Sequence, residues 1–382
     1  MKLSVLFVDD DTSIIEGLRR MMYPMRKEWD LIYANGGKSA LEVLADTKID
    51  VIISDIRMPG LDGTQLLTEV KDKYPNIVRI TLSGYANDNT ALKNTRIVHQ
   101  SLSKPTTPES VKNTIEKAYQ LRKKLHSEEL LSIVNGIDEL PSLPEIYLEL
   151  EKEANSPNSS IDKLSGIMSK DPIMAAKILQ LTNSAFFGLP NRISNITQAL
   201  NFLGIKLIQN LVLSIKLFRS IDPDSQYANI YQEIWNHSNK VAMITHQIAK
   251  IKNLPKSTAE DAYLGGLFHD IGKLLIIENF DGIQISKNCD FSEYEKHFSN
   301  TTHADIGAYL LGIWGLPDPI VESVAYHHIE DTMFENNLTP TKLVYLANKI
   351  SYDKDITVAD ISKDNIDDLI KKYGSLQMEG SK

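Results

Sequence analysis

The first third of the chain alternates short apolar runs with amphipathic stretches. The runs LSVLFV, DVIIS and IVRITLS have the continuous apolar character of strands that are buried on both faces of a parallel sheet. The stretches SIIEGLRRMM, KSALEVLA and GTQLLTEVKDKY lie between them and have the apolar spacing of helices. This repetition of strand and helix predicts a doubly wound α/β domain over residues 1–122.

From residue 136 onward the pattern is helical. Apolar residues recur with a 3.6-residue period in SIDKLSGIMSKDPIMAAKILQLTNSA, ITQALNFLGIKLIQNLVLSIKLF, EIWNHSNKVAMITHQIAK and AEDAYLGGLFHDIGKLLII. No convincing strand pattern interrupts them, so an all-α domain is predicted over residues 136–350. Residues 351–382 are expected to add one helix and a disordered tail.

A segment without Gly or Pro, ESVKNTIEKAYQLRKKLHSEELLSIV, joins the two domains. Val111, Ile115, Ala118 and Leu125 recur in it at helical spacing. The pattern predicts that the last helix of the first domain continues as a connecting helix over residues 109–135. Its apolar seam, residues 109–134, either pairs with a second copy of the chain as a short coiled coil or packs on the chain's own domains.

Composition narrows the function classes. The 382 residues allow two or three domains. The net charge of −9 gives no electrostatic reason to expect nucleic-acid binding, and no DNA-binding helix pair or basic stripe is recognisable.

Cys289 is the single cysteine, which excludes an intramolecular disulfide and a thiolate metal cluster and fits a reducing compartment. No apolar run approaches the roughly 18 residues of a membrane span, and the N-terminus is not a signal peptide, so we expect a cytoplasmic protein.

Polar residues follow the predicted strands of the first domain. They are Asp9 and Asp10, Asp55, Ser83 and Lys104. The carboxyl ends of parallel strands meet at one edge of a sheet, where three clustered carboxylates would need a cation such as Mg²⁺. An aspartate beside Mg²⁺ can accept a phosphoryl group, whose oxygens a lysine and a hydroxyl would bind. Helix capping by these aspartates is the alternative, but it does not explain VDDD, SDIRMPGLDG, LSGYA and SKP in this order.

With these motifs, residues 1–122 resemble the receiver domain of two-component response regulators, which has a flavodoxin-like fold. The resemblance implies that a sensor histidine kinase phosphorylates Asp55. It also implies that Ser83 and Lys104 contact the phosphoryl group, and that Mg²⁺ is held by Asp9, Asp10, Asp55 and the backbone carbonyl of Arg57. The chain has Ser101 where the family often has an aromatic residue, three positions before the lysine. The hydroxyl–aromatic switch of the family is therefore expected to be weak or differently built.

Five of the nine histidines form an ordered series in the second domain: His237, His269, His303, His327 and His328. Each lies in a predicted helix, and the helices of a bundle can direct such side chains into one pocket. Imidazoles with a carboxylate such as Asp270 suit Fe, Mn, Zn or Ni. A single buried histidine is more often only hydrogen-bonded, but the ordered set beside Asp270 favours a metal pocket. Lys273 is expected to share a helix face with His269 and to contact phosphate.

Several motifs of this domain resemble the HDOD output domain over about residues 136–336. They are LPSLPE, SKDPIMAAKILQLTNSAFFGLPNRISNITQALNFLGI, WNHSNKVA, LGGLFHDIGKLLI and HADIGAYLLGIWGLPDPIVESVAYHH. HDOD domains are related to the HD phosphohydrolases, which include the HD-GYP phosphodiesterases of cyclic di-GMP, and many are non-enzymatic signalling modules. The resemblance to HD-GYP enzymes implies one or two metals, with Lys273 as a phosphate contact and the ligands Glu233, His237, His269, Asp270, His303, His327 and His328.

The chain departs from the HD-GYP pattern in two places. No Gly-Tyr-Pro signature follows YHHIEDTMFENN, and Asn348 stands where HD enzymes usually have a last aspartate ligand. An amide oxygen is neutral, so Asn348 would weaken metal binding. Two functions stay open: a response regulator whose HDOD domain acts by protein–protein contacts, for example with an enzyme of cyclic-dinucleotide signalling, and a metal-dependent phosphohydrolase gated by the receiver. The two departures favour the first.

Overall fold

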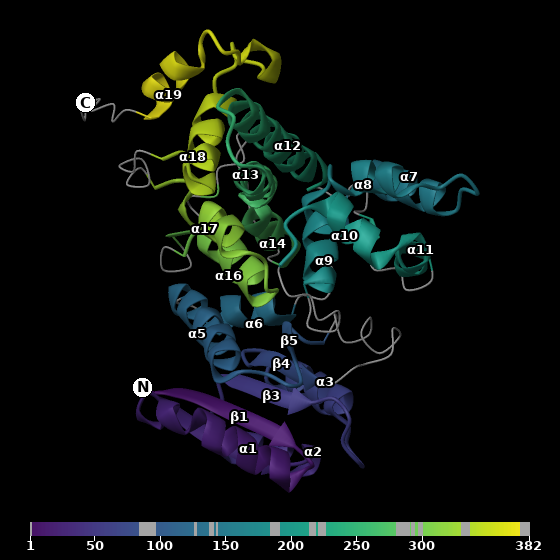
Figure 1. The fold of residues 1–382 in the computed structure, drawn as a ribbon, viewed down its shortest axis with the longest axis vertical. Helices are drawn as coiled ribbons and strands as arrows, with labels where there is room; N and C mark the ends of the chain where they lie inside the picture. Colours follow the sequence, from purple (N-terminus) through teal and green to yellow (C-terminus); the bar gives the residue numbers. More distant parts are fainter. Residues whose placement is uncertain are drawn as a thin grey trace. The chain divides into compact units, whose positions relative to one another are not determined.

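Two compact units make up the chain in the computed structural model (Figure 1). The first unit comprises residues 1–139, 180–192 and 312–315, and the second comprises residues 140–179, 193–311 and 316–382. The structure describes residues 2–83, 97–125, 128–136, 141–142, 144–183, 192–213, 219–220, 227–279, 291, 295–296, 301–329 and 337–374.

A five-stranded sheet with the order β2-β1-β3-β4-β5 forms the centre of the first unit. Its strands are β1 (Leu3–Asp9), β2 (Trp29–Asn35), β3 (Val51–Asp55), β4 (Val78–Ser83) and β5 (Gln100–Ser103). All neighbouring strands are parallel, so each connection crosses over the sheet. The described crossover helices are α1 (Thr12–Met22), α2 (Gly37–Asp46) and α3 (Gly63–Lys73), and a short η1 (Tyr23–Lys27) follows α1. The predicted doubly wound, flavodoxin-like fold is confirmed.

The core of this unit explains why its strands are apolar throughout. All seven residues of β1 are buried, which is expected when helices cover both faces of a sheet. Leu6 of β1 and Ile52 of β3 are register partners, and they belong to one buried cluster with Leu66 and Leu67 of α3. Burial of each such side chain stabilises the fold by about 1.5–3 kcal/mol.

The segment after β5 forms two helices, so the prediction of one continuous connecting helix is wrong. α5 (Pro108–Lys124) and α6 (Glu128–Gly136) are separated at Leu125, which is not helical, and residues 126–127 lie outside the described ones. Three residues of the predicted seam, Val111, Ile115 and Ala118, are almost fully buried (1%, 0% and 0% exposed) within the chain itself. Packing inside the chain therefore accounts for this part of the seam, and dimerisation through residues 109–134 stays a prediction.

A buried arginine on β4 ties the last turn of α6 to the sheet. The guanidinium of Arg79, on β4, donates to the carbonyl of Asn135 at 2.6 Å and to the carbonyl of Ile97 at 2.7 Å. The backbone N–H of Arg79 donates to His99 Nδ1 at 3.0 Å. A helix C-terminus carries unsatisfied carbonyls and partial negative charge, so a cation there stabilises it.

The second unit is helical in its described part. Its helices are α7 (Pro144–Ala154), α8 (Ile161–Met168), α9 (Pro172–Thr182), α10 (Ile196–Leu203), α11 (Ile205–Leu213), α12 (Ala228–Ile251), α13 (Lys256–Phe268), α14 (Ile271–Asn279), α16 (His303–Ile313), α17 (Asp318–Tyr326) and α18 (Pro340–Ser351). Two residue pairs, β6 (Pro141–Ser142) and β7 (Arg219–Ser220), form a minimal parallel ladder that the sequence did not predict. The helical C-terminal region is otherwise as predicted.

The longest helix, α12, supplies the main contact surface of the second unit. Val241, Ile244 and Ile248 of α12 form a buried cluster with Ala262 of α13 and Leu343 of α18. The three α12 residues are three to four positions apart and lie on one face of that helix, so a single apolar face of α12 packs against both α13 and α18. α12, α13 and α18 therefore share one buried apolar cluster.

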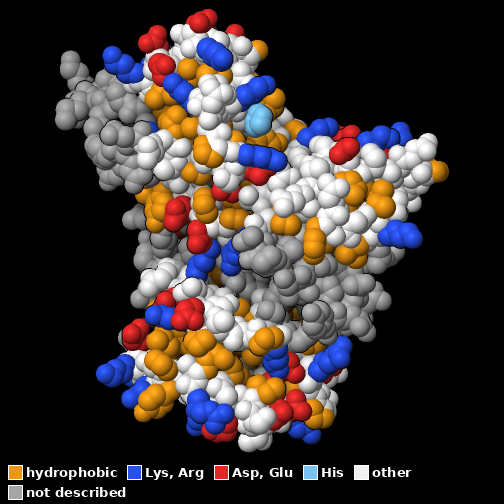
Figure 2. Space-filling view, viewed as in Figure 1, with side chains coloured by type: hydrophobic (Ala, Val, Ile, Leu, Met, Phe, Trp, Pro, Cys, Tyr) orange, Lys and Arg blue, Asp and Glu red, His pale blue; other side chains and the backbone are white. Residues whose placement is uncertain are grey.

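The surface and the C-terminal region add little to the chemistry. Among the described residues, no helix is both long enough and apolar enough to cross a membrane. On the face drawn in Figure 2, the acidic and basic side chains of the described residues are intermixed. After α18, the chain forms η4 (Val358–Asp360) and α19 (Ile366–Gly374), and the predicted disordered tail falls at residues 375–382, outside the described part.

Candidate functional site

The ends of two adjacent strands bring three carboxylates together in the first unit. Asp9 ends β1, Asp10 follows it, and Asp55 ends β3. One oxygen of each carboxylate lies within 4.8 Å of the oxygens of the other two. The structure therefore assembles the three aspartates that the sequence assigned to a Mg²⁺ site, with ligand atoms of the type that this ion prefers.

Lys104 supplies the positive charge of this site. Its Nζ lies 2.7 Å from Asp9 Oδ2 and 3.0 Å from Asp55 Oδ1. Burial alone would lower the pKa of Lys104, but hydrogen bonds to Asp9 and Asp55 outweigh burial and raise that pKa above its ordinary value. The ammonium is therefore charged at neutral pH and stands beside the carboxylate that is expected to react.

Three further residues predicted for this site are placed in part. Ser83 ends β4, but its side chain lies outside the described residues. Arg57 lies two residues beyond Asp55 on an exposed position, and its carbonyl as a metal ligand stays a prediction. Ser101 pairs with Thr81 across β4 and β5, so a small hydroxyl does occupy the position where the family often has an aromatic ring.

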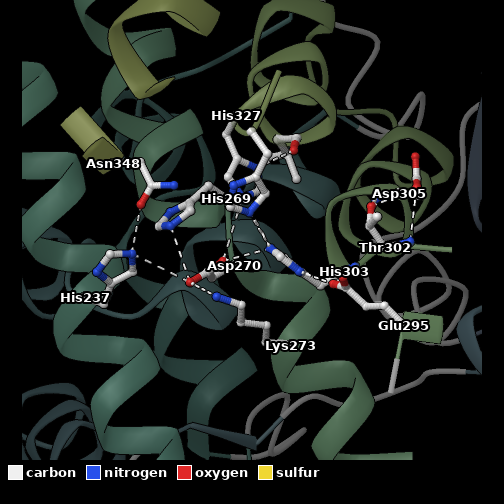
Figure 3. Close-up of polar contacts among 12 residues, drawn as sticks. His237, His269, Asp270, Lys273, Glu295, Thr302, His303, Asp305, His327 and Asn348 are labelled. Carbon is white, nitrogen blue, oxygen red and sulfur yellow. Dashed lines mark hydrogen bonds and ion pairs between the residues drawn. The ribbon is translucent and has the colours of Figure 1, made fainter. Parts of the chain in front are cut away.

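Six potential metal ligands converge in the second unit (Figure 3 shows five of them with labels). Most lie at helix ends rather than inside helices, in contrast to the sequence-based expectation. They are the α13 C-cap His269, Asp270 between α13 and α14, His303 at the start of α16, His327 and His328 just after α17, and His237 inside α12. Lys273 therefore lies on α14, and the prediction that it shares a helix with His269 is wrong.

Small residues let these helix ends approach each other. A Cβ atom on Gly272 would lie 1.9 Å from the carbonyl oxygen of His303, so only glycine fits between the starts of α14 and α16. A Cβ atom on Gly266 would lie 3.0 Å from Ala242 Cα, which shows how tightly α13 packs on α12. Gly272 brings Asp270 to His303, and Gly266 brings His269 to the helix that carries His237.

The carboxylate of Asp270 lies between two groups of nitrogen atoms. Its Oδ1 is 3.2 Å from His303 Nε2 and 3.9 Å from His327 Nε2. Its Oδ2 is 2.8 Å from Lys273 Nζ, 3.4 Å from His269 Nε2 and 3.8 Å from His237 Nε2. Asp270 is 2% exposed, so these contacts are made in a desolvated environment.

Hydrogen bonds on the far side of three imidazoles decide which nitrogen faces the cluster. Nδ1 of His269 donates to the carbonyl of Gly266, and Nδ1 of His327 donates to the carbonyl of Val324, each at 2.7 Å. Nδ1 of His303 donates to Glu295 Oε1 at 2.5 Å. In each neutral ring the proton is then on Nδ1, and the lone pair of Nε2 points to the cluster.

The electrostatics keep most of these ligands in their metal-binding form. Burial lowers the pKa of His237 to about 4, and burial with the neighbouring histidines holds the pKa of His327 well below its ordinary value. Burial would raise the pKa of Asp270, but the neighbouring His269 and Lys273 hold it well below its ordinary value. Burial opposes protonation of His303, yet the neighbouring carboxylates of Asp270 and Glu295 raise its pKa. Neutral imidazoles and an ionised carboxylate are the forms that bind metals.

Three residues change the predicted ligand set. Glu233 is solvent-exposed on α12 and is not in either group of converging ligands found among the described residues, so its role as a ligand stays a prediction. The amide Oδ1 of Asn348 lies 3.1 Å from His237 Nε2. Glu295, which the sequence analysis missed, accepts both Nδ1–H and the backbone N–H of His303. A lone glutamate eight residues before a histidine carries no recognisable signal.

The donor atoms fit a divalent transition metal. Two buried acceptors, His269 Nε2 and Asp270 Oδ1, form no hydrogen bond within the described part of the chain. Such unsatisfied buried groups cost about 1–3 kcal/mol each, and a metal ion would satisfy them. Imidazole nitrogens with one carboxylate suit Zn, Fe, Mn or Ni better than Mg or Ca.

Family models match both halves of the chain. The HDOD domain model matches residues 140–330, and the response regulator receiver domain model matches residues 5–116. The chain therefore belongs to the HDOD family and carries an N-terminal receiver domain. Receiver domains generally bind Mg²⁺ and HD-type domains bind metals, in agreement with the two groups of ligands.

Relatives share parts of this arrangement. An uncharacterized protein of Treponema pallidum is 27% identical over 52% of this chain and 39% of its own length. The hydrogenase transcriptional regulatory protein HoxA of Cupriavidus necator is 34% identical over 31% of this chain and 24% of its own length. The chain thus spans well under half of these curated relatives. A solved signal receiver domain of an HD domain-containing protein from Pseudomonas fluorescens Pf-5 is 26% identical over 32% of this chain and 98% of its own, with a TM-score of 0.31.

Proposed function

We propose that a sensor histidine kinase phosphorylates the chain on Asp55, and that the HDOD domain passes this signal on through protein–protein contacts in the cytoplasm. The observation that carries the first part is Lys104, whose Nζ bridges Asp9 and Asp55 at 2.7 and 3.0 Å. The phosphoryl group would move from the donor to a carboxylate oxygen of Asp55, and Lys104 would neutralise its oxygens. Mg²⁺, when held by the three aspartates, would offset further phosphoryl charge.

The phosphoacceptor is tested with the intact protein, Mg²⁺ and acetyl phosphate as donor. Mass spectrometry should show one added phosphoryl group on the wild type and none on Asp55→Ala. Asp30→Ala is the matched control, because this carboxylate is 61% exposed and lies outside the site; it should be labelled like the wild type. Equal labelling of Asp55→Ala would contradict the assignment.

Two features support an output through protein contacts rather than catalysis. Asn348 supplies a neutral oxygen next to His237, where a carboxylate would add the charge that a second metal needs. Lys273 already neutralises one oxygen of Asp270. The partner we propose is another protein of cyclic-dinucleotide signalling, which would recognise the HDOD domain differently when Asp55 is phosphorylated.

Metal-dependent hydrolysis of a phosphodiester such as cyclic di-GMP is the second candidate function, favoured by the four histidines that face Asp270 and by His328 beside them. A bound metal would polarise a phosphodiester and activate water, and Lys273 would be the residue to contact a phosphate. The test is turnover of cyclic di-GMP with Mn²⁺ or Fe²⁺, with and without acetyl phosphate. Turnover that His269→Ala/Asp270→Ala abolishes would establish the enzyme, and no turnover under any condition would leave the protein-contact function.

A further inference from the structure

Asp270 separates the ligand cluster into two unequal halves. The first half contains the Nε2 atoms of His303, His327 and His328 together with Asp270 Oδ1. The second contains His237, His269 and Asp270 Oδ2. The three histidine nitrogens of the first half are close enough together for one cation, and so are the three ligand atoms of the second. The difference between the halves therefore lies in charge and in the hydrogen bonds already formed.

His303 Nε2 has neighbours at the donor spacings of a tetrahedral metal site. His303 Nε2 lies 3.3 Å from His327 Nε2, 3.2 Å from His328 Nε2 and 3.2 Å from Asp270 Oδ1. A tetrahedral metal with bonds of about 2.0–2.2 Å holds its donor atoms about 3.3–3.6 Å apart. With their Nδ1–H groups bonded elsewhere, His303 and His327 turn their Nε2 atoms towards each other, and both atoms could coordinate a cation placed between them.

Negative charge is concentrated behind this first half. Glu295 accepts two hydrogen bonds from His303, which fixes the ring and makes its Nε2 a stronger donor. The Glu295 side chain is 19% exposed, so its charge acts in a partly desolvated environment. The His303 ring therefore has a carboxylate on each side: Glu295 at Nδ1 and Asp270 at Nε2.

The second half already contains a cation, and Asp270 is the one charged ligand among its described residues. Lys273 Nζ contacts Asp270 Oδ2 at 2.8 Å, closer than either histidine of that half. Asn348 Oδ1 accepts a hydrogen bond from His237 Nε2 at 3.1 Å, which places a proton on the nitrogen that would otherwise bind metal. A divalent cation here would have to displace the lysine and that proton in a buried space with no further negative charge among its described ligands.

We infer that the HDOD domain binds one divalent transition metal through His303, His327, His328 and Asp270 Oδ1, while Lys273 takes the place of a second metal at Asp270 Oδ2. This inference rests on the metal-binding chemistry of the second candidate function. Three imidazoles and one carboxylate select Zn²⁺, Co²⁺, Ni²⁺ or Fe²⁺ over Mg²⁺. His237, His269 and Asn348 then lie around the Lys273–Asp270 ion pair without binding a metal.

The test is a titration of the full, chelator-treated chain with Co²⁺, in excess Mg²⁺ to occupy the receiver carboxylates. Ligand-field absorption reports cobalt bound to imidazole, and elemental analysis after gel filtration gives the stoichiometry. The wild type should bind one equivalent. Lys273→Met/Asn348→Asp should bind two, because it removes the internal cation and restores a charged ligand.

Two matched histidine variants locate the metal. His237 has a side chain that is 19% exposed, and His328 is also exposed, so neither variant should unfold the protein. His328→Gln should weaken cobalt binding at least about tenfold, whereas His237→Gln should keep the single equivalent within about threefold.

Each alternative result overturns a different statement. Two equivalents on the wild type, or one on Lys273→Met/Asn348→Asp, would contradict the role of Lys273. Binding that depends on His237 and not on His328 would place the metal in the other half. No cobalt binding at all would remove the second candidate function together with this inference.

Discussion

Lys273 Nζ lies 2.8 Å from Asp270 Oδ2, and the two side chains are 9% and 2% exposed. An ion pair at this depth is desolvated, so the removal of one partner leaves the other as an uncompensated buried charge. The same carboxylate faces four histidines of the cluster, which makes Asp270 the residue on which the site depends most.

Asp270→Asn should therefore destabilise the protein by about 3–5 kcal/mol and abolish transition-metal binding. Urea unfolding of the chelator-treated chain measures the first effect. Asp367→Asn is the control, because its ion pair with Lys252 involves a carboxylate that is 80% exposed; it should change stability by less than about 1 kcal/mol. Similar stability of the two variants would show that the buried ion pair is not as important as its geometry indicates.

Gly272→Ala should lower stability by about 1–3 kcal/mol or more and reduce metal binding, because its Cβ would meet the His303 carbonyl at 1.9 Å. Gly166→Ala in α8 is a control of opposite sign. No atom lies within 4 Å of a Cβ at Gly166, so this change should stabilise the helix by about 0.5–1 kcal/mol. Thermal or urea unfolding distinguishes the two, and a neutral Gly272→Ala would contradict the close approach of α14 and α16.

The stability of the metal-free protein should depend on pH below neutrality. The pKa of His237 is lowered to about 4 in the folded protein, against 6.5 in the unfolded chain. As pH falls from 6.5 towards 4, the unfolded chain therefore binds a proton at this residue that the folded chain does not. The free energy of unfolding decreases by about 1.4 kcal/mol per pH unit for each such group. His327 acts in the same direction, and His303, with a raised pKa, acts in the opposite one.

Urea unfolding between pH 7 and pH 5 in the presence of a chelator measures this slope. His237→Asn should make the slope shallower by about one titrating group, whatever its effect on stability at pH 7. An unchanged slope would mean that His237 is not held neutral by its surroundings.

Arg79→Met should loosen the last turn of α6 and destabilise the first unit by about 2–4 kcal/mol, because the carbonyl of Ile97 loses the Arg79 donor and the carbonyl of Asn135 keeps only His99 Nε2 at 3.2 Å. Hydrogen exchange should rise in residues 128–136 in particular. Arg20→Met, an exposed arginine in α1, should change neither quantity. Unaltered protection of α6 in Arg79→Met would show that this helix is held by its apolar contacts alone.

The sequence predicts those elements whose pattern of apolar residues follows a simple pattern of burial. β1 is buried at every position and reads as a continuous apolar run, whereas β2 has a mixed burial pattern and gives no such run. The three aspartates were predictable because parallel strands end at one edge, whatever the details of the fold.

Other features depend on contacts that the local sequence does not encode. The break at Leu125 follows no Gly or Pro, so helical spacing alone predicted one helix across it. The histidines were expected inside helices because their neighbours are apolar, but the structure places most of them where helices end. Lys273 and Glu295 have roles set by atoms contributed from other segments, which spacing along the chain cannot show.

The central claim is that phosphorylation of the receiver domain changes the HDOD domain. Hydrogen exchange of the full chain, with Mg²⁺ and with or without beryllofluoride as a phosphoryl mimic, tests it most directly, and Asp55→Ala is the control. We expect altered protection within residues 140–330 of the wild type and none in the variant. A change confined to residues 5–116, or an equal change in Asp55→Ala, would contradict the claim.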